Sequence, residues 1–284
     1  MANNHAIHGN YHGYYAKRPV ATDERLAVLP SNIFQGCRVL DIGCNEGWLT
    51  CDIAQNRGAT FVVGVDIDDS LIQGAWRRRR AIWSMQGPTS GHTELVDTDP
   101  SPPTKKRKKN DTQDKDEEAA HVASATPLSG YFPASCEHEL GPLPIPPSTR
   151  RGKTVFPHNI AFRTADWVTT TIVDDAEGYN VVLALSVSKW IHLNDGDEGI
   201  KTFFKRVYGV LQPGGRFVFE PQPWESYAKA RRMDPKLKEN ASKLTLRPND
   251  FTALLQELGF KLEKCYNEVG EGGFKRSIEV YLRL

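Results

Sequence analysis

The chain has 284 residues, of which 39% are hydrophobic and 25% charged, and its formal net charge is +1. This length allows one large domain or two small ones, and the near-zero charge excludes a protein that holds nucleic acid by bulk positive charge alone. The five cysteines are scattered without a Cys-x-x-Cys pair, which argues against a disulfide framework and a structural zinc site. No apolar run reaches the ~18–20 residues of a membrane span, and the first residues lack the pattern of a secretory signal. These features predict a soluble intracellular globular protein without a metal centre.

Short apolar runs alternate with helical patterns along the chain. The first strands are predicted at 38–43 and 61–66, and helical spacing follows them at 48–56 and 70–85. Later segments predict strands at 160–163, 179–187 and 217–219, helices at 199–211 and 248–258, and a closing antiparallel pair at 261–268 and 277–284. Strands that alternate with helices indicate an α/β domain, with a mostly parallel sheet covered on both faces.

Composition changes sharply after Gly87. Residues 88–157 hold 11 of the 18 prolines, together with the basic run Lys105–Lys109 and an acidic run at 114–118. Such a stretch cannot bury enough apolar surface to offset the entropy of ordering it, so we expect a disordered insertion between the two halves of one domain, 1–87 and 158–284. The basic run is typical of a nuclear import signal, or else it is a solvated charge run balanced by its acidic neighbour. We therefore expect a nuclear protein, with a cytoplasmic pool left open.

A tight glycine turn follows the first strand. The sequence from Asp41 to Gly47 has glycines at Gly43 and Gly47, which differs from the Gly-x-Gly-x-x-Gly fingerprint of dinucleotide sites. Asp66 ends the second strand, where its carboxylate can accept hydrogen bonds from ribose hydroxyls. The turn alone is also compatible with an ordinary strand–helix connection. Together with Asp66 and a later Leu-Gln-Pro-Gly-Gly, it favours an S-adenosylmethionine site over a nicotinamide site.

Three further segments carry a family resemblance. They are an aromatic stretch at 9–15, the run Ser-Val-Ser-Lys-Trp-Ile-His-Leu-Asn at 186–194, and Glu-Pro-Gln-Pro-Trp at 220–224. In this order they resemble the methylphosphate capping enzymes, the bicoid-interacting type of RNA methyltransferase, over the whole chain except the insertion. The resemblance implies a class I S-adenosylmethionine-dependent methyltransferase, with a Rossmann-like, mostly parallel seven-stranded sheet and a closing antiparallel hairpin.

Members of this family transfer a methyl group from S-adenosyl-L-methionine to a 5′ phosphate of a small non-coding RNA. One branch caps the γ-phosphate of a polymerase III transcript, and another methylates a 5′ monophosphate. The Tyr14-Tyr15 pair and the context of Glu-Pro-Gln-Pro-Trp are closer to the triphosphate branch. We therefore expect γ-phosphate capping of a small nuclear RNA.

The motif and the resemblance place the cofactor contacts at twelve positions: Tyr15, Arg25, Asp41, Gly43, Cys44, Asn45, Gly47, Asp66, Ile67, Asp166, Trp167 and Leu185. Arg25 can pair with the methionine carboxylate in a bidentate manner, although an exposed helix charge is the plainer reading of that residue.

The acceptor side needs phosphate ligands rather than a base. A phosphate oxygen is already anionic at neutral pH, so the site must hold it in line with the methyl group and tolerate its charge. Lys189, His192 and Tyr14 supply suitable donors and are the predicted catalytic residues. The predicted RNA contacts are Tyr11, Lys17, Trp190, Glu220, Gln222 and Trp224. The two tryptophans can stack on the first base or belong to the core, and Glu220 requires a cationic partner beside a phosphate chain.

Basic residues at 77–80 and 231–243 predict an RNA-backbone track, or a solvated charged face. A rival hypothesis is an RNA-binding ribonucleoprotein subunit of the same fold whose methylation is dispensable. A methyltransferase for small molecules or protein is disfavoured, because the Asp/Asn-Pro-Pro-Tyr/Phe loop of amino-group methyltransferases is absent. The expected partners are a small RNA with a 5′ phosphate and ribonucleoprotein proteins. We expect no membrane or metal, and a monomeric catalytic unit.

Overall fold

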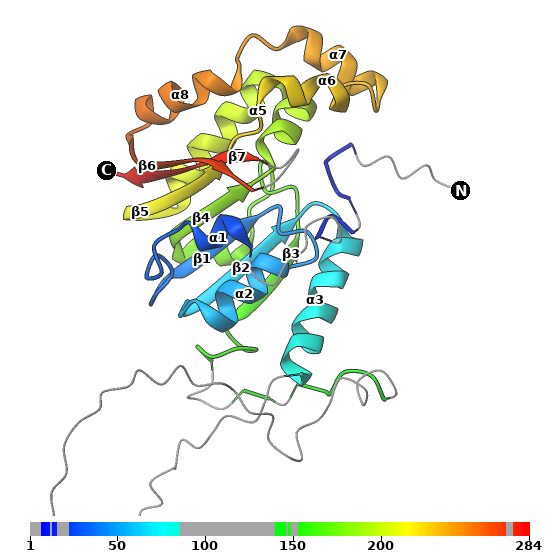
Figure 1. The fold of residues 1–284 in the computed structure, drawn as a ribbon, viewed down its shortest axis with the longest axis vertical. Helices are drawn as coiled ribbons and strands as arrows, with labels where there is room; N and C mark the ends of the chain where they lie inside the picture. Colours follow the sequence, from blue (N-terminus) through cyan, green and yellow to red (C-terminus); the bar gives the residue numbers. More distant parts are fainter. Residues whose placement is uncertain are drawn as a thin grey trace, which may run out of the picture.

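The fold is built on one seven-stranded sheet (Figure 1). The computed structural model describes residues 7–11, 13–15, 23–85, 140–145, 147–148, 153–270 and 275–284. Its strands are β1 (Arg38–Ile42), β2 (Phe61–Asp66), β3 (Ile160–Thr164), β4 (Tyr179–Leu185), β5 (Leu211–Glu220), β6 (Phe260–Val269) and β7 (Arg276–Arg283). They lie in the order β3-β2-β1-β4-β5-β7-β6. The first five pair in parallel, whereas β7 is antiparallel to both β5 and β6. The predicted α/β class, with its mostly parallel sheet and closing hairpin, is confirmed.

Helices cover both faces of the sheet, which is why the central strands are almost continuously apolar. The helices are α1 (Glu24–Ala27), α2 (Trp48–Asn56), α3 (Asp69–Ser84), α5 (Ser188–Val210), α6 (Tyr227–Ala230), α7 (Pro235–Lys243) and α8 (Phe251–Glu257). Short 3-10 turns lie at Val173–Glu177, Trp224–Ser226 and Pro248–Asp250. Helices α2 and α3 pack on one face, where Ile53 and Ile72 are buried, and α5 and α8 pack on the other around Phe204 and Phe251.

The helix after β4 differs from its predicted extent. Helical spacing predicted a start at residue 199, but α5 begins at Ser188 and bends at Gly196, which has a φ of 70°. The bend interrupts the apolar periodicity, so the first turns could not be recognised from spacing. Strand β4 correspondingly ends at Leu185, before the expected residue 187. As a result, Lys189 and His192 lie on a helix.

Most of the predicted insertion, including the basic run 105–109, lies outside the described residues. Strands from before and after it join the same sheet, because β1 and β2 precede it and β3 follows it. Its far end docks on α3, where Arg79 Nε donates to Pro157 O at 2.7 Å and Arg80 Nε donates to Leu143 O at 3.0 Å. Arg78 lies 3.3 Å above the ring of Trp48. These three arginines therefore have contacts within the protein, and the RNA-backbone track at 77–80 and 231–243 stays a prediction.

Among the described residues, no helix is long and apolar enough to cross a membrane. In the same part of the chain, no group of three or more His, Cys, Asp or Glu side chains is placed to hold a metal ion.

Candidate active site

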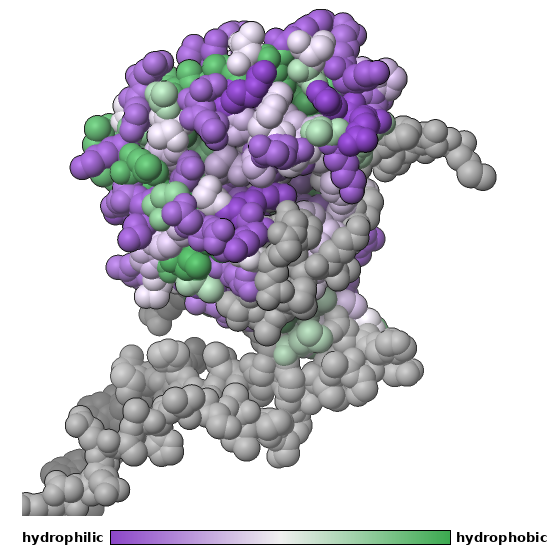
Figure 2. Space-filling view, turned by 45° about the horizontal axis from the view of Figure 1, so that its top comes forward, coloured by the Kyte–Doolittle hydropathy of each residue, from purple (hydrophilic) through white to green (hydrophobic). Residues whose placement is uncertain are grey.

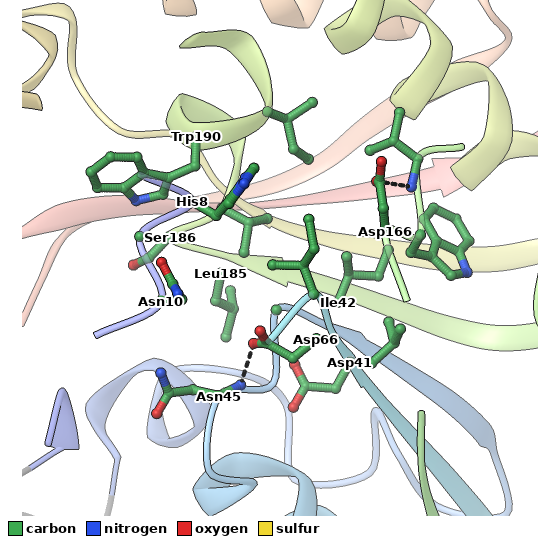
Figure 3. A pocket seen from close by; sticks show the side chains of 18 of the residues that line it. His8, Asn10, Asp41, Ile42, Asn45, Asp66, Asp166, Leu185, Ser186 and Trp190 are labelled. Atoms are coloured by element: carbon green, nitrogen blue, oxygen red, sulfur yellow. Dashed lines mark hydrogen bonds between the residues drawn. The ribbon is translucent and has the colours of Figure 1, made fainter. Parts of the chain in front are cut away.

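A pocket opens at the carboxyl ends of β1, β2 and β4 (Figure 3). Strand β1 pairs with β2 on one side and with β4 on the other, so the chain leaves these neighbouring strands in opposite directions across the sheet. Ligands of open α/β sheets bind at such a switch point. The lining includes Asp41 near the end of β1 and Gly43 just after it, Asp66 at the end of β2, and Leu185 at the end of β4 with Ser186 just after it.

Two buried carboxylates form the polar floor of the pocket. Asp41 accepts a hydrogen bond from Thr50 Oγ1 at 2.7 Å, and burial raises the pKa of its carboxyl to about 6. Asp66 accepts from the backbone N–H of Asn45 at 2.9 Å and from that of Asp68 at 3.1 Å, and burial raises its pKa as well. A carboxylate has about four acceptor sites, so both can take further donors from a ligand. Hydroxyl and ammonium groups fit this requirement.

Gly43 is required by the turn beneath the pocket. Its φ is 74°, and a Cβ at this position would lie 2.2 Å from Val187 Cγ1. Cys44 and Gly47 were predicted to contact the cofactor, but the structure places neither in the pocket lining. Cys44 is 2% exposed, and a Cβ on Gly47 would lie 2.9 Å from the Ala75 side chain. Cys44 instead belongs to the hydrophobic core, and Gly47 leaves room for Ala75 of α3 and Phe162 of β3.

Arg25 lies inside the protein, so its interpretation as an exposed helix charge is wrong. It is 3% exposed and lines the pocket. Its Nη2 donates to Asp23 Oδ2 at 2.8 Å and to the Tyr15 hydroxyl at 3.3 Å, and its Nη1 donates to Glu220 Oε2 at 3.4 Å. Tyr15 also stacks on Trp48, with 5.5 Å between ring centroids. The arrangement presents a fixed guanidinium to an anionic ligand group.

Another part of the pocket lining, around Asp166, is mostly apolar. Ile67, Trp167, Val168 and Leu185 supply the apolar surface, and Asp166 accepts from the backbone N–H of Val168 at 3.1 Å (Figure 3). A flat heteroaromatic ring fits between such surfaces. Apart from Cys44 and Gly47, every predicted cofactor residue therefore lines this pocket: Tyr15, Arg25, Asp41, Gly43, Asn45, Asp66, Ile67, Asp166, Trp167 and Leu185.

Ser186 joins the pocket to a second, more cationic region. It directly follows β4 with a φ of 65°, a conformation that is strained for a residue with a side chain. Its hydroxyl donates to Glu220 Oε2 at 2.9 Å and accepts from Arg276 Nη1 at 2.8 Å. The Tyr14 hydroxyl lies 3.2 Å from Ser186 Oγ. Since Ser186 has one proton and gives it to Glu220, Tyr14 is the donor of that contact.

Lys189 lies just beyond Ser186, at the start of α5. Its side chain is 9% exposed, and its Nζ lies 4.9 Å from the centroid of the Trp190 ring. Burial, together with the positive charges of Arg276 and Lys229, lowers the pKa of the Lys189 amine to about 8. An anion bound here would relieve this destabilisation. Lys189 is outside the lining of the cofactor pocket itself.

The structure places His192 away from the pocket, although it was predicted as a catalytic donor. It is fully buried, with Nε2 at 2.8 Å from Asp197 Oδ1 and Nδ1 at 3.2 Å from the Tyr227 hydroxyl. Burial lowers the pKa of the imidazole, against the effect of Asp197. Both ring nitrogens are engaged inside the protein, so in this arrangement His192 is a core residue that joins α5 to α6.

Glu220 and Gln222 are buried rather than at the rim. Glu220 is paired with Arg25 and with Arg276, whose Nη1 lies 3.1 Å from Oε1, so the expected cationic partners are present. Gln222 Oε1 accepts from Ser188 Oγ and from the backbone N–H of Lys189, both at 2.9 Å. Gln222 therefore fixes the first turn of α5, and with it the position of Lys189.

The aromatic residues are divided between core and surface. Trp190 is 8% exposed and lines the pocket, and it packs so closely on Gly9 that a Cβ there would lie 2.2 Å from its Nε1. Tyr11 is exposed and meets Trp190 edge-on at 5.9 Å. Trp224 is partly buried under the guanidinium of Arg247, at 4.1 Å. The predicted RNA contact at Lys17 lies outside the described residues.

Sequence reasoning did not identify the N-terminal segment 7–11 as part of the pocket wall. His8, Gly9 and Asn10 line the pocket, and Asn194 and Asp195 belong to the same lining. Asn194 Nδ2 donates to the carbonyl of residue 7, and Asn10 Nδ2 donates to Asp68 Oδ2 at 2.7 Å. The aromatic stretch that begins at Gly9 was a signal for function, but nothing in it indicated which strand ends the segment would cross.

The strand order, the antiparallel hairpin and the pocket at the switch point define a class I S-adenosylmethionine-dependent methyltransferase fold. In agreement with this, the chain superposes on a structure of a complex between the Trm112 methyltransferase activator of Haloferax volcanii and a methyltransferase. The TM-score is 0.50 with 11% sequence identity, over 96% of this chain and 90% of that one. At this identity the likeness concerns the fold alone.

Sequence comparison is more specific. Residues 179–283 match the family model of bicoid-interacting protein 3 (Bin3). A probable RNA methyltransferase of Arabidopsis thaliana is 35% identical over 95% of this chain and 77% of its own length. The 7SK snRNA methylphosphate capping enzyme of Mus musculus is 38% identical over 96% of this chain, which spans 40% of that enzyme's length. The U6 snRNA methylphosphate capping enzyme of Drosophila melanogaster is 29% identical over 97% of the chain. The chain belongs to the Bin3 family.

Proposed function

We propose that this protein is an S-adenosylmethionine-dependent RNA methyltransferase that methylates a 5′ phosphate of a small RNA. One observation carries the proposal: a pocket suited to the cofactor is joined through Ser186 to a cationic region that contains Lys189 and Arg276. The names of the mouse and fly relatives, both methylphosphate capping enzymes of small nuclear RNAs, support it.

The pocket residues fit S-adenosylmethionine group by group. Arg25 would hold the methionine carboxylate, Asp41 the region of the ammonium, Asp66 the ribose hydroxyls, and the slot beside Asp166 the adenine. When bound, the cofactor supplies an electrophilic methyl group. The chain's own contribution is to fix the cofactor's orientation and to exclude water, which the 7–11 segment does by closing one wall of the pocket.

The acceptor side requires charge stabilisation rather than proton removal. A 5′ phosphate is anionic at neutral pH, so a general base such as His192 has no proton to remove from the attacking oxygen. Lys189 would bind the phosphate, and this role is supported by its position three residues after Ser186, which lines the cofactor pocket and contacts Tyr14. Holding the acceptor oxygen in line with the methyl group and stabilising its charge would lower the barrier to transfer.

The direct test is transfer of labelled methyl from S-adenosylmethionine to one short hairpin RNA made with a 5′ triphosphate, a 5′ monophosphate or a 5′ hydroxyl. Transfer to the triphosphate RNA alone is the expected result, and it would assign γ-phosphate capping. Transfer to the monophosphate RNA alone would place the protein with the monophosphate methyltransferases. Tight RNA binding without transfer to any of the three would contradict the proposal and favour a ribonucleoprotein subunit.

We also propose that the protein acts in the nucleus and associates there with ribonucleoprotein proteins. The basic run Lys105–Lys109 supports nuclear import. Replacing its five residues with glutamine in a fluorescent fusion should shift the protein to the cytoplasm. An unchanged nuclear signal would contradict the role of this run.

A further inference from the structure

We infer that Arg276 of β7 is a specificity-determining residue that, with Lys189, makes the acceptor site require a phosphorylated 5′ end. The inference rests on the proposed function and adds to it a residue that neither the sequence motifs nor the family resemblance pointed to. It concerns recognition of the terminal phosphate chain rather than binding of the cofactor.

The topology of the sheet explains why a residue of the last strand reaches this site. Strand β7 is antiparallel to β5, with Phe219 opposite Glu279, so the first residues of β7 lie beside the last residues of β5. Arg276 is the first residue of β7, and Glu220 is the last of β5. The closing hairpin therefore delivers a guanidinium to the carboxyl edge of the parallel strands, where the ligands of this fold bind.

The contacts of Arg276 place it at the junction of the two regions. Its Nη1 donates to Ser186 Oγ at 2.8 Å and to Glu220 Oε1 at 3.1 Å, and its side chain is 11% exposed. Ser186 in turn lines the cofactor pocket and contacts Tyr14. Arg276 is thus held beside the point at which an acceptor must approach the cofactor.

The local charge balance indicates an anionic ligand. Glu220 accepts from Arg25, Arg276 and Ser186, and Asp23 is a second carboxylate paired with Arg25, so the two guanidinium groups are matched and the excess positive charge is that of Lys189 and Lys229. In the described part of the chain, the charges that act on Lys189 most strongly are those of Arg276 and Lys229, which are both positive. Like charges are gathered here at a cost in stability, and such an arrangement is typical of binding sites. A phosphate chain would neutralise them, and a guanidinium can hold two phosphate oxygens at once.

The surrounding surface is compatible with an extended polyanion. Beyond Lys189, helices α6 and α7 and their connection carry Lys229, Arg231, Arg232, Lys236 and Lys238. The face of the molecule that includes these helices is largely hydrophilic (Figure 2). Lys229 of α6 lies close enough to Lys189 for its charge to act on the amine, so this basic surface adjoins the site at Lys189.

The experiment measures RNA binding, so that it does not depend on turnover. The dissociation constants of one hairpin RNA with a 5′ triphosphate, a 5′ monophosphate or a 5′ hydroxyl are measured by fluorescence anisotropy in the presence of S-adenosylhomocysteine. The proteins are the full chain, Arg276→Gln, Arg276→Lys and the control Arg216→Gln. Arg216 lies in β5 and pairs with Glu263, but this pair is exposed and far from the pocket lining. Affinity for S-adenosylhomocysteine is measured separately by calorimetry.

We expect the unmodified protein to prefer phosphorylated RNA, and Arg276→Gln to lose about 10-fold or more of that preference, since it removes a charge-assisted hydrogen bond to the phosphate. Binding of the 5′-hydroxyl RNA and of S-adenosylhomocysteine should stay within about 2-fold. Arg276→Lys keeps the positive charge but loses the paired N–H donors of the guanidinium, so it should retain part of the preference. Arg216→Gln should match the unmodified protein throughout.

Two results would overturn the inference: an unchanged phosphate preference in Arg276→Gln, or an equal loss of affinity for all three RNAs. If Arg276→Gln does not fold, the phosphate preference of Arg276→Lys is the test. Full retention of the preference in that variant would contradict the role of the paired guanidinium donors. A lack of any phosphate preference in the unmodified protein would instead contradict the proposed function. The two failures are therefore distinguishable.

Discussion

Replacing Lys189 with methionine should abolish methyl transfer and at the same time make the protein more stable. Lys189 is 9% exposed and stands among positive charges, and the pKa of its amine is lowered from 10.5 to about 8. Methionine has a similar length, is uncharged and adapts to irregular surroundings. The substitution thus removes the destabilising charge and retains most of the packing.

The size of the effect follows from the pKa. A decrease from 10.5 to about 8 corresponds to about 3 kcal/mol of native-state destabilisation at pH 7. Loss of the contact with the Trp190 ring offsets about 1 kcal/mol of the gain, which leaves about 2 kcal/mol. At about 2–4 °C per kcal/mol for a domain of this size, the melting temperature should rise by about 4–8 °C.

The pH dependence gives the sharper test. Between pH 8 and pH 10.5 the unfolded chain binds the Lys189 proton more strongly than the native protein, so native stability rises with pH over this window. Lys189→Met lacks this amine. Its gain in stability over the unmodified protein should therefore be largest at pH 7 and should vanish as pH approaches 10.5. Thermal unfolding at pH 7, 8.5 and 10 measures it. The control is Lys205→Met, which removes an exposed lysine from the same helix and should show no such trend.

The reasoning would be refuted by a variant that melts below the unmodified protein at pH 7, or by a gain that does not change with pH. Affinity for S-adenosylhomocysteine should remain within about 2-fold, because Lys189 is outside the lining of the cofactor pocket. A parallel loss of cofactor affinity would instead place Lys189 among the cofactor contacts.

Three other substitutions separate structural from binding roles. Arg25→Met leaves Asp23 and Glu220 buried without this cation, so unfolding should become easier by about 3–5 kcal/mol. The loss should shrink as pH falls and the carboxylates take up protons, which urea titrations at pH 8 and pH 5 would reveal. Gly43→Ala should abolish cofactor binding in calorimetry, because the added Cβ would lie 2.2 Å from Val187 Cγ1. The control is Gly36→Ala: Gly36 also has a positive φ, but no atom lies within 4 Å of an added Cβ, so this variant should bind the cofactor normally. His192→Gln should lower the free energy of unfolding by about 1–3 kcal/mol and leave the KM for RNA unchanged. A rise in KM without loss of stability would instead show that His192 acts in the acceptor site.

The parts of the site that follow from local sequence were predictable. Asp41, Gly43 and Asp66 lie at strand ends, and a strand end followed by a glycine turn is visible in the sequence itself. In a parallel sheet all such ends meet at one edge, so the pocket could be placed without knowing the packing. The apolar character of the central strands likewise predicted a sheet buried on both faces.

The parts that depend on packing were not predictable. His192 lies one helical turn after Lys189, and the sequence does not show which face of a kinked helix turns inward. Arg25 belongs to a short polar segment whose burial depends on Glu220, which is 195 positions away. Arg276 reaches the site because β7 runs antiparallel to β5, a pairing between distant segments. Such long-range relations leave no local periodicity to detect.

The docking of the segment around Leu143 and Pro157 on α3 has a practical consequence for protein engineering. Arg79 and Arg80 fasten the returning chain to the same helix from which the preceding chain departs, at Met85. The entropy of closing a loop grows only slowly with its length once its ends are held together. The stretch between Met85 and Leu140 is thus an acceptor position for a grafted module, such as a fluorescent reporter or an affinity domain. The end of α3, from which this stretch departs, lies at the opposite side of the molecule from α6 and α7 (Figure 1), so the attachment point is remote from these helices.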